Sequence, residues 1–339
     1  VALDVPDHVR DFVRQTADFL LAGHSSEAVA LLSSVRPAMG ALEVALEVLR
    51  KTERLPADAD PFLLVNGIHA GFSNAVLEYT DGLAEYKPDG SRGDLTELEV
   101  FSIDDDETRE IDDALSVEFD GERTIVGIHI ADPAFFVQKD DTLDRVAADR
   151  PLSLYLPTTT VTMFPERLSC DLASLTAGVL RPSLSFRITF DAAGGVIDWE
   201  VGGAQVCVRH RLNYDQADAI LAEPESPLNQ AVSRLAFLSQ ALAASREAAG
   251  GLNLSRPELK IVVEDGQISV RCLDMASPSR RLVSEFMVLA NRLTAEYALR
   301  HDLPVIYRIQ DPPTEAVESV PVYDPVVFER QVRKLKRTR

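Results

Sequence analysis

The sequence predicts an α+β protein in which a mixed or antiparallel sheet is packed with helices and is preceded by a small all-helical N-terminal domain. From residue 98 onward, short runs of β-branched and apolar residues recur between longer stretches with helical spacing. Residues 1–55 instead place their apolar side chains at helical spacing throughout. A chain of 339 residues, 46% of them hydrophobic, is long enough for two or more domains with separate cores.

Three short helices are expected in residues 1–55. The first ends near Gly23, the second covers 27–35, and the third continues to Lys51. This accessory domain could be helix-turn-helix-like, but it has no basic recognition helix, so a role in packing or in binding an unidentified partner is equally open. Residues 56–91 are rich in proline and glycine, and we expect them to form a connector.

The region 92–339 carries the expected sheet and its helices. Strands are predicted at 100–103, 114–119, 124–131, 185–190, 196–199, 205–209, 259–263 and 268–272. Helices are predicted at 142–148, 215–222, 229–249 and 279–300. Along 124–131, apolar side chains such as Val126 and Ile128 alternate with Gly127 and His129, which is typical of a strand with two different faces. At such a position His129 is expected to be a hydrogen-bonded core residue.

Composition limits the classes of function. The net charge of −20 and a pI of about 4.7 argue against broad, non-specific duplex binding, but not against a narrow channel for a single strand. No apolar run approaches the roughly 20 residues of a membrane span, and no signal-peptide pattern opens the chain. Cys170, Cys207 and Cys272 form no metal-spaced pair. We therefore expect a cytoplasmic, monomeric protein with reduced thiols and no membrane attachment.

An acidic segment, residues 104–113, is the candidate functional site. It holds seven carboxylates and one arginine, and apolar residues flank it on both sides. Two like charges about 4 Å apart repel by roughly 4 kcal/mol at an effective dielectric of about 20, so such a segment needs a compensating interaction to fold against apolar neighbours. A hard divalent cation is one explanation, and a solvated acidic loop is the other. An EF-hand starting at Asp104 is excluded, because Arg109 and Leu115 would replace its invariant glycine and glutamate.

The order of these acids is more specific than their number. The sequence Ser-Ile-Asp104, a spacer, and Glu110-Ile-Asp112-Asp113-Ala-Leu resembles the signature of the ribonuclease II (RNB) family, in which aspartate usually stands at the position of Glu110. The resemblance implies an RNB-type catalytic domain and a Mg²⁺-dependent 3′→5′ exoribonuclease that hydrolyses single-stranded RNA to nucleoside 5′-monophosphates. It also implies catalytic roles for Asp104, Glu110, Asp112 and Asp113, with Asp104, Asp112 and Asp113 as the metal ligands.

Further motifs extend the resemblance over residues 92–313. The segment around Tyr155 resembles the family's Tyr-Leu-Pro, whose tyrosine stacks on a base, and the segment around Tyr214 resembles one whose tyrosine lies near the ribose 2′-OH. Arg281 and Glu285 lie in a stretch that resembles a family helix whose glutamate takes part in sugar recognition. The resemblance thus implies substrate binding by four residues: Tyr155, Tyr214, Arg281 and Glu285. A contact to the 2′-OH would separate RNA from DNA.

Two alternatives remain open. The family continues with a Thr-Ser-Pro-Leu-Arg-Arg-Tyr segment that supplies a catalytic arginine, and usually with an S1 domain, so we expect the catalytic domain to be C-terminally incomplete at Arg339. That expectation, together with Glu110 and with Ile261 where a second stacking aromatic is expected, motivates a catalytically impaired RNB scaffold that binds RNA. A metal-dependent phosphodiesterase acting on short or non-RNA substrates is the other alternative.

Overall fold

The computed structural model describes residues 34, 40–52, 55, 60–252, 257–264, 267–317 and 323–336. The chain divides into two compact units, and each is considered by itself. The first unit comprises Val1–Asn74 with Ser153–Thr162, and the second comprises Ala75–Leu152 with Met163–Arg339. The expected division into a helical domain, a connector and a catalytic domain at residues 55 and 91 stays a prediction.

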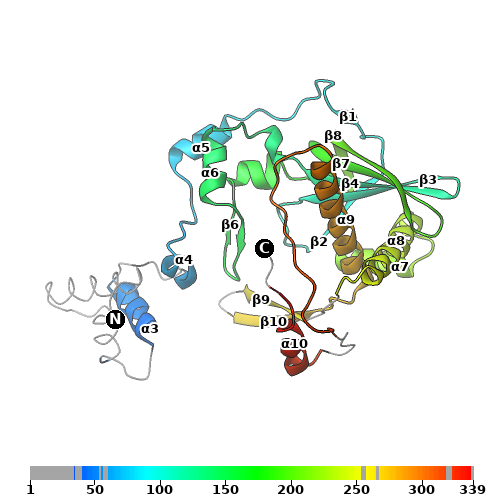
Figure 1. The fold of residues 1–339 in the computed structure, drawn as a ribbon. Coiled ribbons are helices and arrows are strands. Elements are labelled where there is room, and N and C mark those ends of the chain that lie inside the picture. Colours follow the sequence, from blue (N-terminus) through cyan, green and yellow to red (C-terminus); the bar gives the residue numbers. More distant parts are fainter. Residues whose placement is uncertain are drawn as a thin grey trace. The chain divides into compact units, whose positions relative to one another are not determined.

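The first unit contains helices α3 (Ala41–Lys51) and α4 (Pro61–Val65) and the short strands β5 (Leu154–Tyr155) and β6 (Thr160–Val161) (Figure 1). Helix α3 confirms the predicted third helix, whereas the helices predicted near residues 9–23 and over 27–35 lie outside the described residues, apart from Ser34. Asp60 caps α4 by accepting a hydrogen bond from the Phe62 N–H at 2.7 Å.

The second unit is built around a six-stranded sheet with the order β1-β8-β2-β3-β4-β7 (Figure 1). Its strands are β1 (Gly93–Asp94), β2 (Val100–Asp104), β3 (Asp113–Asp120), β4 (Arg123–Ala131), β7 (Leu180–Phe190) and β8 (Val196–Asn213). Strands β2, β3, β4, β7 and β8 pair antiparallel in succession, whereas β8 pairs parallel with β1 and β2. Because β8 pairs with both β7 and β2, the strand order closes on itself. This mixed sheet with its helices confirms the predicted α+β class.

Strand β8 differs from the sequence-based expectation. The sequence predicts two strands, 196–199 and 205–209, and Gly202 and Gly203 interrupt the apolar pattern between them. The structure instead has one strand of 18 residues, since β7 pairs with it continuously along the whole interruption. Gly203 also leaves room for Arg92, whose Nη1 would lie only 3.2 Å from a Cβ at that position. Pairing with a neighbouring strand therefore overrides the local break.

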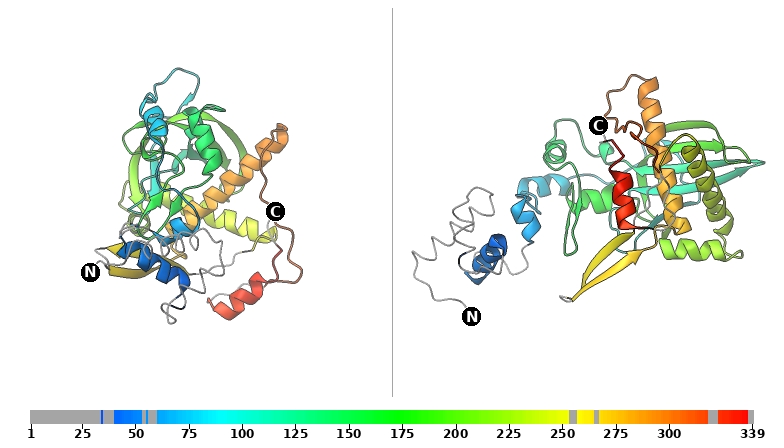
Figure 2. Two further views of the ribbon diagram at one scale, coloured as in Figure 1. Left: turned by 90° about the vertical axis from the view of Figure 1, so that its left-hand side faces the viewer. Right: turned by 60° about the horizontal axis from the view of Figure 1, so that its bottom comes forward.

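Helices α7 (Tyr214–Ala222), α8 (Asn229–Ala248) and α9 (Pro278–Arg300) cover one face of this sheet (Figures 1 and 2). The alternation predicted for β4 defines that face, because Val126 and Ile128 are fully buried and belong to the same core as Leu235 and Phe286 of the helices. Burial of apolar side chains on this scale is the main favourable contribution to folding.

The second unit also contains elements outside this sheet and its three covering helices. They are α5 (Asn74–Asp81), which begins at the last residue of the first unit, the short helices η1 (Pro133–Phe135) and η2 (Arg167–Leu172), and helices α6 (Thr142–Asp149) and α10 (Pro325–Val332). Strands β9 (Glu258–Glu264) and β10 (Gln267–Leu273) form a separate antiparallel hairpin (Figure 2). Among the described residues, no helix combines the length and the apolar character needed to cross a membrane.

A buried polar chain centred on His129 occupies the sheet face opposite α7–α9. Ser116 Oγ lies 3.0 Å from His129 Nε2, and Ser185 Oγ lies 2.8 Å from His129 Nδ1. Burial lowers the pKa of His129 to about 4, so the ring is neutral at pH 7 and offers one donor and one acceptor to the two hydroxyls. His129 is therefore the hydrogen-bonded core residue that the sequence predicted.

Gly127→Ala should destabilise the protein strongly. A Cβ at residue 127 would lie 2.3 Å from Ser116 Oγ and 2.6 Å from His129 Nε2, so the buried hydrogen bond between them could not survive. Overpacking and a broken buried hydrogen bond together should lower the free energy of unfolding by about 2–4 kcal/mol, as measured by urea denaturation. Gly202→Ala is the matched control, because a Cβ there meets no atom within 4 Å. An equal loss in both variants would contradict the local cause.

Candidate active site

Two neighbouring strands present the acidic segment. Strand β2 ends at Asp104, β3 begins at Asp113, and the two strands pair antiparallel, so both side chains lie at the same end of the sheet. Ile111 anchors the loop between them. It is buried, its N–H donates to Ser174 Oγ at 3.0 Å, and its carbonyl accepts from the Leu175 N–H at 2.9 Å. Ile111 therefore fixes the end of the loop next to β3.

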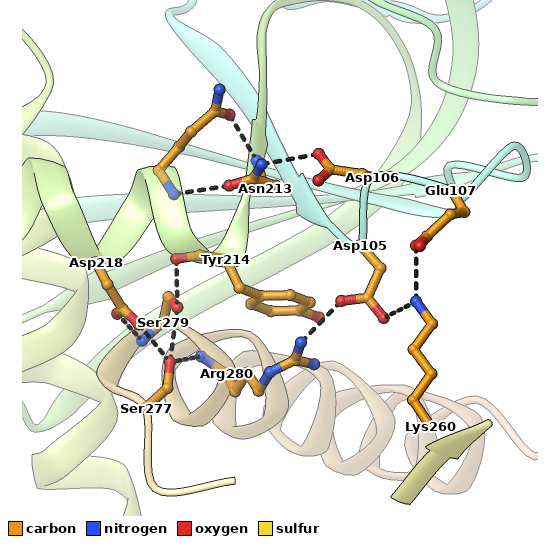
Figure 3. A network of polar contacts seen from close by, with 11 residues as sticks. Asp105, Asp106, Glu107, Asn213, Tyr214, Asp218, Lys260, Ser277, Ser279 and Arg280 are labelled. Carbon is orange, nitrogen blue, oxygen red and sulfur yellow. Dashed lines mark hydrogen bonds and ion pairs between the residues drawn. The ribbon is translucent and has the colours of Figure 1, made fainter. Parts of the chain in front are cut away.

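Some of the seven carboxylates are paired with lysine or arginine from distant elements (Figure 3). Asp105 accepts hydrogen bonds from Arg280 Nη2 at 2.8 Å and from Lys260 Nζ at 3.4 Å. Burial would raise the pKa of Asp105, but Arg280 and Lys260 outweigh it and hold that pKa below its ordinary value. Lys260 also donates to Glu107 at 2.7 Å and lowers the pKa of its carboxyl. Asp105 and Glu107 are thus ionised and already neutralised.

The end of β8 holds the backbone of the same loop. Arg211 Nη2 donates to the carbonyl oxygens of Asp106 at 3.2 Å and of Thr108 at 2.6 Å. The Asn213 amide donates to the Asp106 carboxylate at 2.8 Å (Figure 3). Three spacer acids are consequently engaged within the fold, and the loop has a defined shape between its two anchoring strands.

By contrast, three acids of the predicted catalytic set have raised pKa values: Asp104, Asp112 and Asp113. Burial, followed by the charge of Asp113, raises the pKa of Asp104 to about 7, and the charge of Arg211 offsets this only in part. Burial raises the pKa of Asp112 and of Asp113 to about 6, with Glu110 adding to the first and Asp112 to the second. Asp112 is exposed to solvent, yet the surrounding protein still displaces enough water to raise its pKa. These carboxylates repel one another.

A divalent cation fits the chemistry of this group. Asp104 Oδ2 is buried and has no hydrogen-bond partner in the described part of the chain, so an oxygen ligand is available there. As placed, however, no three His, Cys, Asp or Glu side chains among the described residues are grouped closely enough to hold an ion. Mg²⁺ commonly takes only one or two protein carboxylates and completes its shell with water and phosphate oxygens, which suits this arrangement. The ligand set Asp104, Asp112 and Asp113 stays a prediction.

Tyr214 lies beside these acids at the start of α7. Asn213 caps the helix through reciprocal hydrogen bonds with Gln216, which sets the direction in which the chain leaves β8. Burial, followed by the charge of Asp104, raises the pKa of Tyr214 to about 12, so its hydroxyl keeps its proton at pH 7. The guanidinium of Arg280 lies 4.0 Å from the centroid of the Tyr214 ring. The structure thus brings Tyr214 to the acidic cluster, while its contact with ribose stays a prediction.

The other predicted substrate-binding residues are distributed differently. Glu285 is buried on α9, and its carboxylate accepts a 2.6 Å hydrogen bond from Arg246 of α8. Arg281 is exposed on the first turns of α9. Tyr155 is 69% exposed on β5, in the first unit. Their roles stay predictions.

Sequence reasoning missed Arg280 and Lys260. Arg281 is the predicted binding residue, whereas its neighbour Arg280 is the one that contacts the acidic loop. Helical spacing did not separate the two arginines, because Val283, three residues after Arg280, and Glu285, four residues after Arg281, are both buried. Lys260 carried no local signal either, because its contact with Glu107 joins residues 153 positions apart.

Asp104→Asn should stabilise the metal-free protein at neutral pH. A folded-state pKa of about 7, against an ordinary 3.8, means that the native state binds this proton more tightly than the unfolded chain does. The stabilising contribution is complete below about pH 4 and is lost as the pH rises through about 7. Asparagine removes this loss, so the melting temperature in EDTA should rise by roughly 3–8 °C at pH 7.5 and by less at pH 5.

Thermal unfolding at the two pH values checks this expectation. Asp120→Asn is the matched control, because Asp120 is exposed at the far end of β3, and its melting temperature should stay within about 2 °C of wild type. A melting temperature of Asp104→Asn below that of wild type at pH 7.5 would contradict the electrostatic argument.

The sequence is similar to those of known ribonucleases. The chain is 38% identical over 233 residues to an uncharacterized ribonuclease of Synechocystis, covering 67% of this chain and 34% of that protein. It is 31% identical over 236 residues to ribonuclease R of Chlamydia trachomatis, covering 69% of this chain and 34% of that protein. The chain thus spans about a third of the length of these relatives.

A solved structure shares the fold. Ribonuclease R of Mycoplasma genitalium, in complex with ribose-methylated single-stranded RNA, aligns with a TM-score of 0.69 and 25% identity, over 75% of this chain and 41% of that one. Residues 92–321, which carry the acidic signature, the sheet and helices α7–α9, match the RNB domain. Since this match covers most of the chain, the protein belongs to the RNB family.

Proposed function

We propose that the protein is a 3′→5′ exoribonuclease that hydrolyses single-stranded RNA to nucleoside 5′-monophosphates with Mg²⁺ as its cofactor. The observation that carries the proposal is the division of the seven carboxylates. Arg280 and Lys260 neutralise Asp105 and Glu107, and the Asn213 amide donates a hydrogen bond to Asp106. Asp104 and Asp113, by contrast, lie at the same end of two paired strands and have raised pKa values. Membership of the RNB family supports the same activity.

Asp104, Asp112 and Asp113 would hold the metal, with Glu110 in support. When bound, Mg²⁺ would lower the pKa of a water molecule and stabilise charge on the attacking and leaving oxygens of the phosphodiester. The raised pKa values suit this role, because the carboxylates gain most from a cation that removes their mutual repulsion.

Each of the four predicted substrate-binding residues would supply one kind of contact to the RNA. The Tyr214 hydroxyl, which stays protonated, can donate a hydrogen bond to the ribose 2′-OH. Glu285 can accept one from a sugar hydroxyl, since Arg246 holds its carboxylate in one orientation. Tyr155 offers an exposed ring for stacking on a base, a contact that tolerates every sequence. Arg281 would meet the phosphate backbone as an exposed cation.

The setting that we propose is the cytoplasm, with the protein acting as a monomer. The free thiols of Cys170, Cys207 and Cys272 support a reducing compartment. Size-exclusion chromatography with light scattering tests the monomer, and a concentration-dependent dimer mass would contradict it.

Digestion of a 5′-labelled single-stranded RNA in Mg²⁺ tests the activity. We expect labelled products that shorten one nucleotide at a time, release of nucleoside 5′-monophosphates, and little digestion of DNA of the same sequence. Internal cuts would contradict an exonuclease. Equal digestion of DNA would favour the broader phosphodiesterase, and RNA binding without nucleotide release would favour the impaired scaffold.

A further inference from the structure

Arg280 joins two parts of the site that come from different elements (Figure 3). Its guanidinium stacks over the Tyr214 ring at 4.0 Å and donates to Asp105 Oδ1 at 2.8 Å. Its side chain is only 18% exposed, so both contacts are partly shielded from water and salt. A planar guanidinium can stack face to face on a ring while its edge pairs with a carboxylate, whereas an ammonium group has no plane to stack on the ring.

The backbone around Arg280 and Tyr214 is fixed independently. Ser279 Oγ donates to the Tyr214 carbonyl at 3.0 Å, and the Ser279 N–H donates to Asp218 Oδ1 at 2.9 Å. Ser277 caps α9 and donates through its hydroxyl to Asp218 Oδ2 at 2.6 Å (Figure 3). The first turns of α7 and α9 are therefore locked together. These bonds fix the backbone, whereas the Tyr214 ring itself packs against the hydrophobic core and has Arg280 over one of its faces.

Asp105, which accepts the hydrogen bond from Arg280, is also held in place. Asp105 accepts a second hydrogen bond from Lys260, and Arg211 holds the carbonyl of the next residue, Asp106. Arg280 therefore ties a fixed loop, which follows directly on Asp104, to the ring of Tyr214. A change at Arg280 should remove the contact on one face of the ring and let the ring shift, without removing any of the predicted catalytic carboxylates.

We propose that Arg280 is a positioning residue that orients Tyr214 toward the ribose and thereby sets the preference for RNA over DNA. This proposal rests on one part of the proposed function, namely that a single-stranded nucleic acid binds with its ribose at Tyr214. Arg280 acts through Tyr214, and the Asp105 carboxylate keeps the guanidinium over the ring.

Binding measurements in EDTA test this inference without hydrolysis. Fluorescence polarisation gives the affinities of 5′-labelled single-stranded RNA and DNA of the same sequence for wild type, Arg280→Met, Tyr214→Phe and the double variant. We expect Arg280→Met to lower the RNA-to-DNA affinity ratio by about 2- to 30-fold, the range that a cation–π contact supports. Tyr214→Phe should lower the ratio similarly. The double variant should show no further loss, because both changes remove the same contact, the one between the Tyr214 hydroxyl and the ribose.

Two further variants sharpen the result. Arg280→Lys keeps the charge beside Asp105 but lacks the planar stack, so its RNA-to-DNA affinity ratio should lie between those of wild type and Arg280→Met. It replaces Arg280→Met in the test if that variant does not fold. Arg292→Met is the control, because Arg292 is 55% exposed on the same helix and pairs with Glu296. Its ratio should equal that of wild type.

Three results would overturn the proposal. They are an unchanged ratio in the Arg280 variants, a wild-type protein without preference for RNA, and equal losses from Arg280→Met with and without Tyr214→Phe. The third result would show that Arg280 acts on the nucleic acid directly. Nucleotide release is measured separately, so a protein that prefers RNA through Arg280 but releases nothing would refute the nuclease activity alone.

Discussion

Asp112→Asn should lower the rate of nucleotide release from single-stranded RNA by about a thousandfold while leaving the protein folded. The substitution keeps the shape of the side chain but removes a charge from the group in which burial and Glu110 already raise the pKa of Asp112 to about 6. Initial rates on 5′-labelled RNA at saturating Mg²⁺ measure the effect, and circular dichroism checks the fold.

Asp120→Asn separates a local effect from a general loss of charge. Strand β3 begins at Asp113 and ends at Asp120, so Asp120→Asn removes one carboxylate at the end of β3 that lies away from the acidic segment. Its rate should remain within about twofold of wild type, as for surface substitutions with small energetic effects. If Asp112→Asn retains wild-type activity, or if both variants lose it equally, the assignment of Asp112 is wrong.

Removal of divalent cations should abolish nucleotide release, and Mg²⁺ should both restore release and raise the melting temperature. The carboxylates of Asp104, Asp112 and Asp113 repel one another in the metal-free protein, and a cation that binds only the folded state stabilises it by mass action. At about one hundred times the dissociation constant the gain is roughly 2.7 kcal/mol, or about 5–10 °C for a domain of this size.

The melting temperature with and without Mg²⁺ therefore tests metal binding independently of activity. NaCl at matched ionic strength is the control, because it screens surface charges without binding at the cluster. The shift caused by Mg²⁺ should be much smaller in Asp104→Asn, since that variant has already lost one carboxylate. A shift of the same size in Asp104→Asn and wild type would place the metal elsewhere, and release that persists in EDTA would contradict a metal-dependent reaction.

Local sequence determined most of the secondary structure. The predicted runs at 100–103, 114–119 and 124–131 became β2, β3 and β4, and the helical stretch at 229–249 became α8, because side-chain periodicity is encoded within a few neighbouring residues. The alternation of Val126 and Ile128 with Gly127 and His129 also predicted the two faces of β4. The order of the acids identified the family before any contact was known.

Only the tertiary structure decided which of the seven acids are neutralised. Asp105 and Asp113 are the same residue type in the same segment, and they differ because Arg280, 175 positions away from Asp105, reaches one and not the other. The same reasoning applies to β8, where pairing with β7 joined two predicted strands into one. Periodicity is a local property, whereas charge pairing and strand pairing depend on which distant elements pack together, and packing is set by the whole chain.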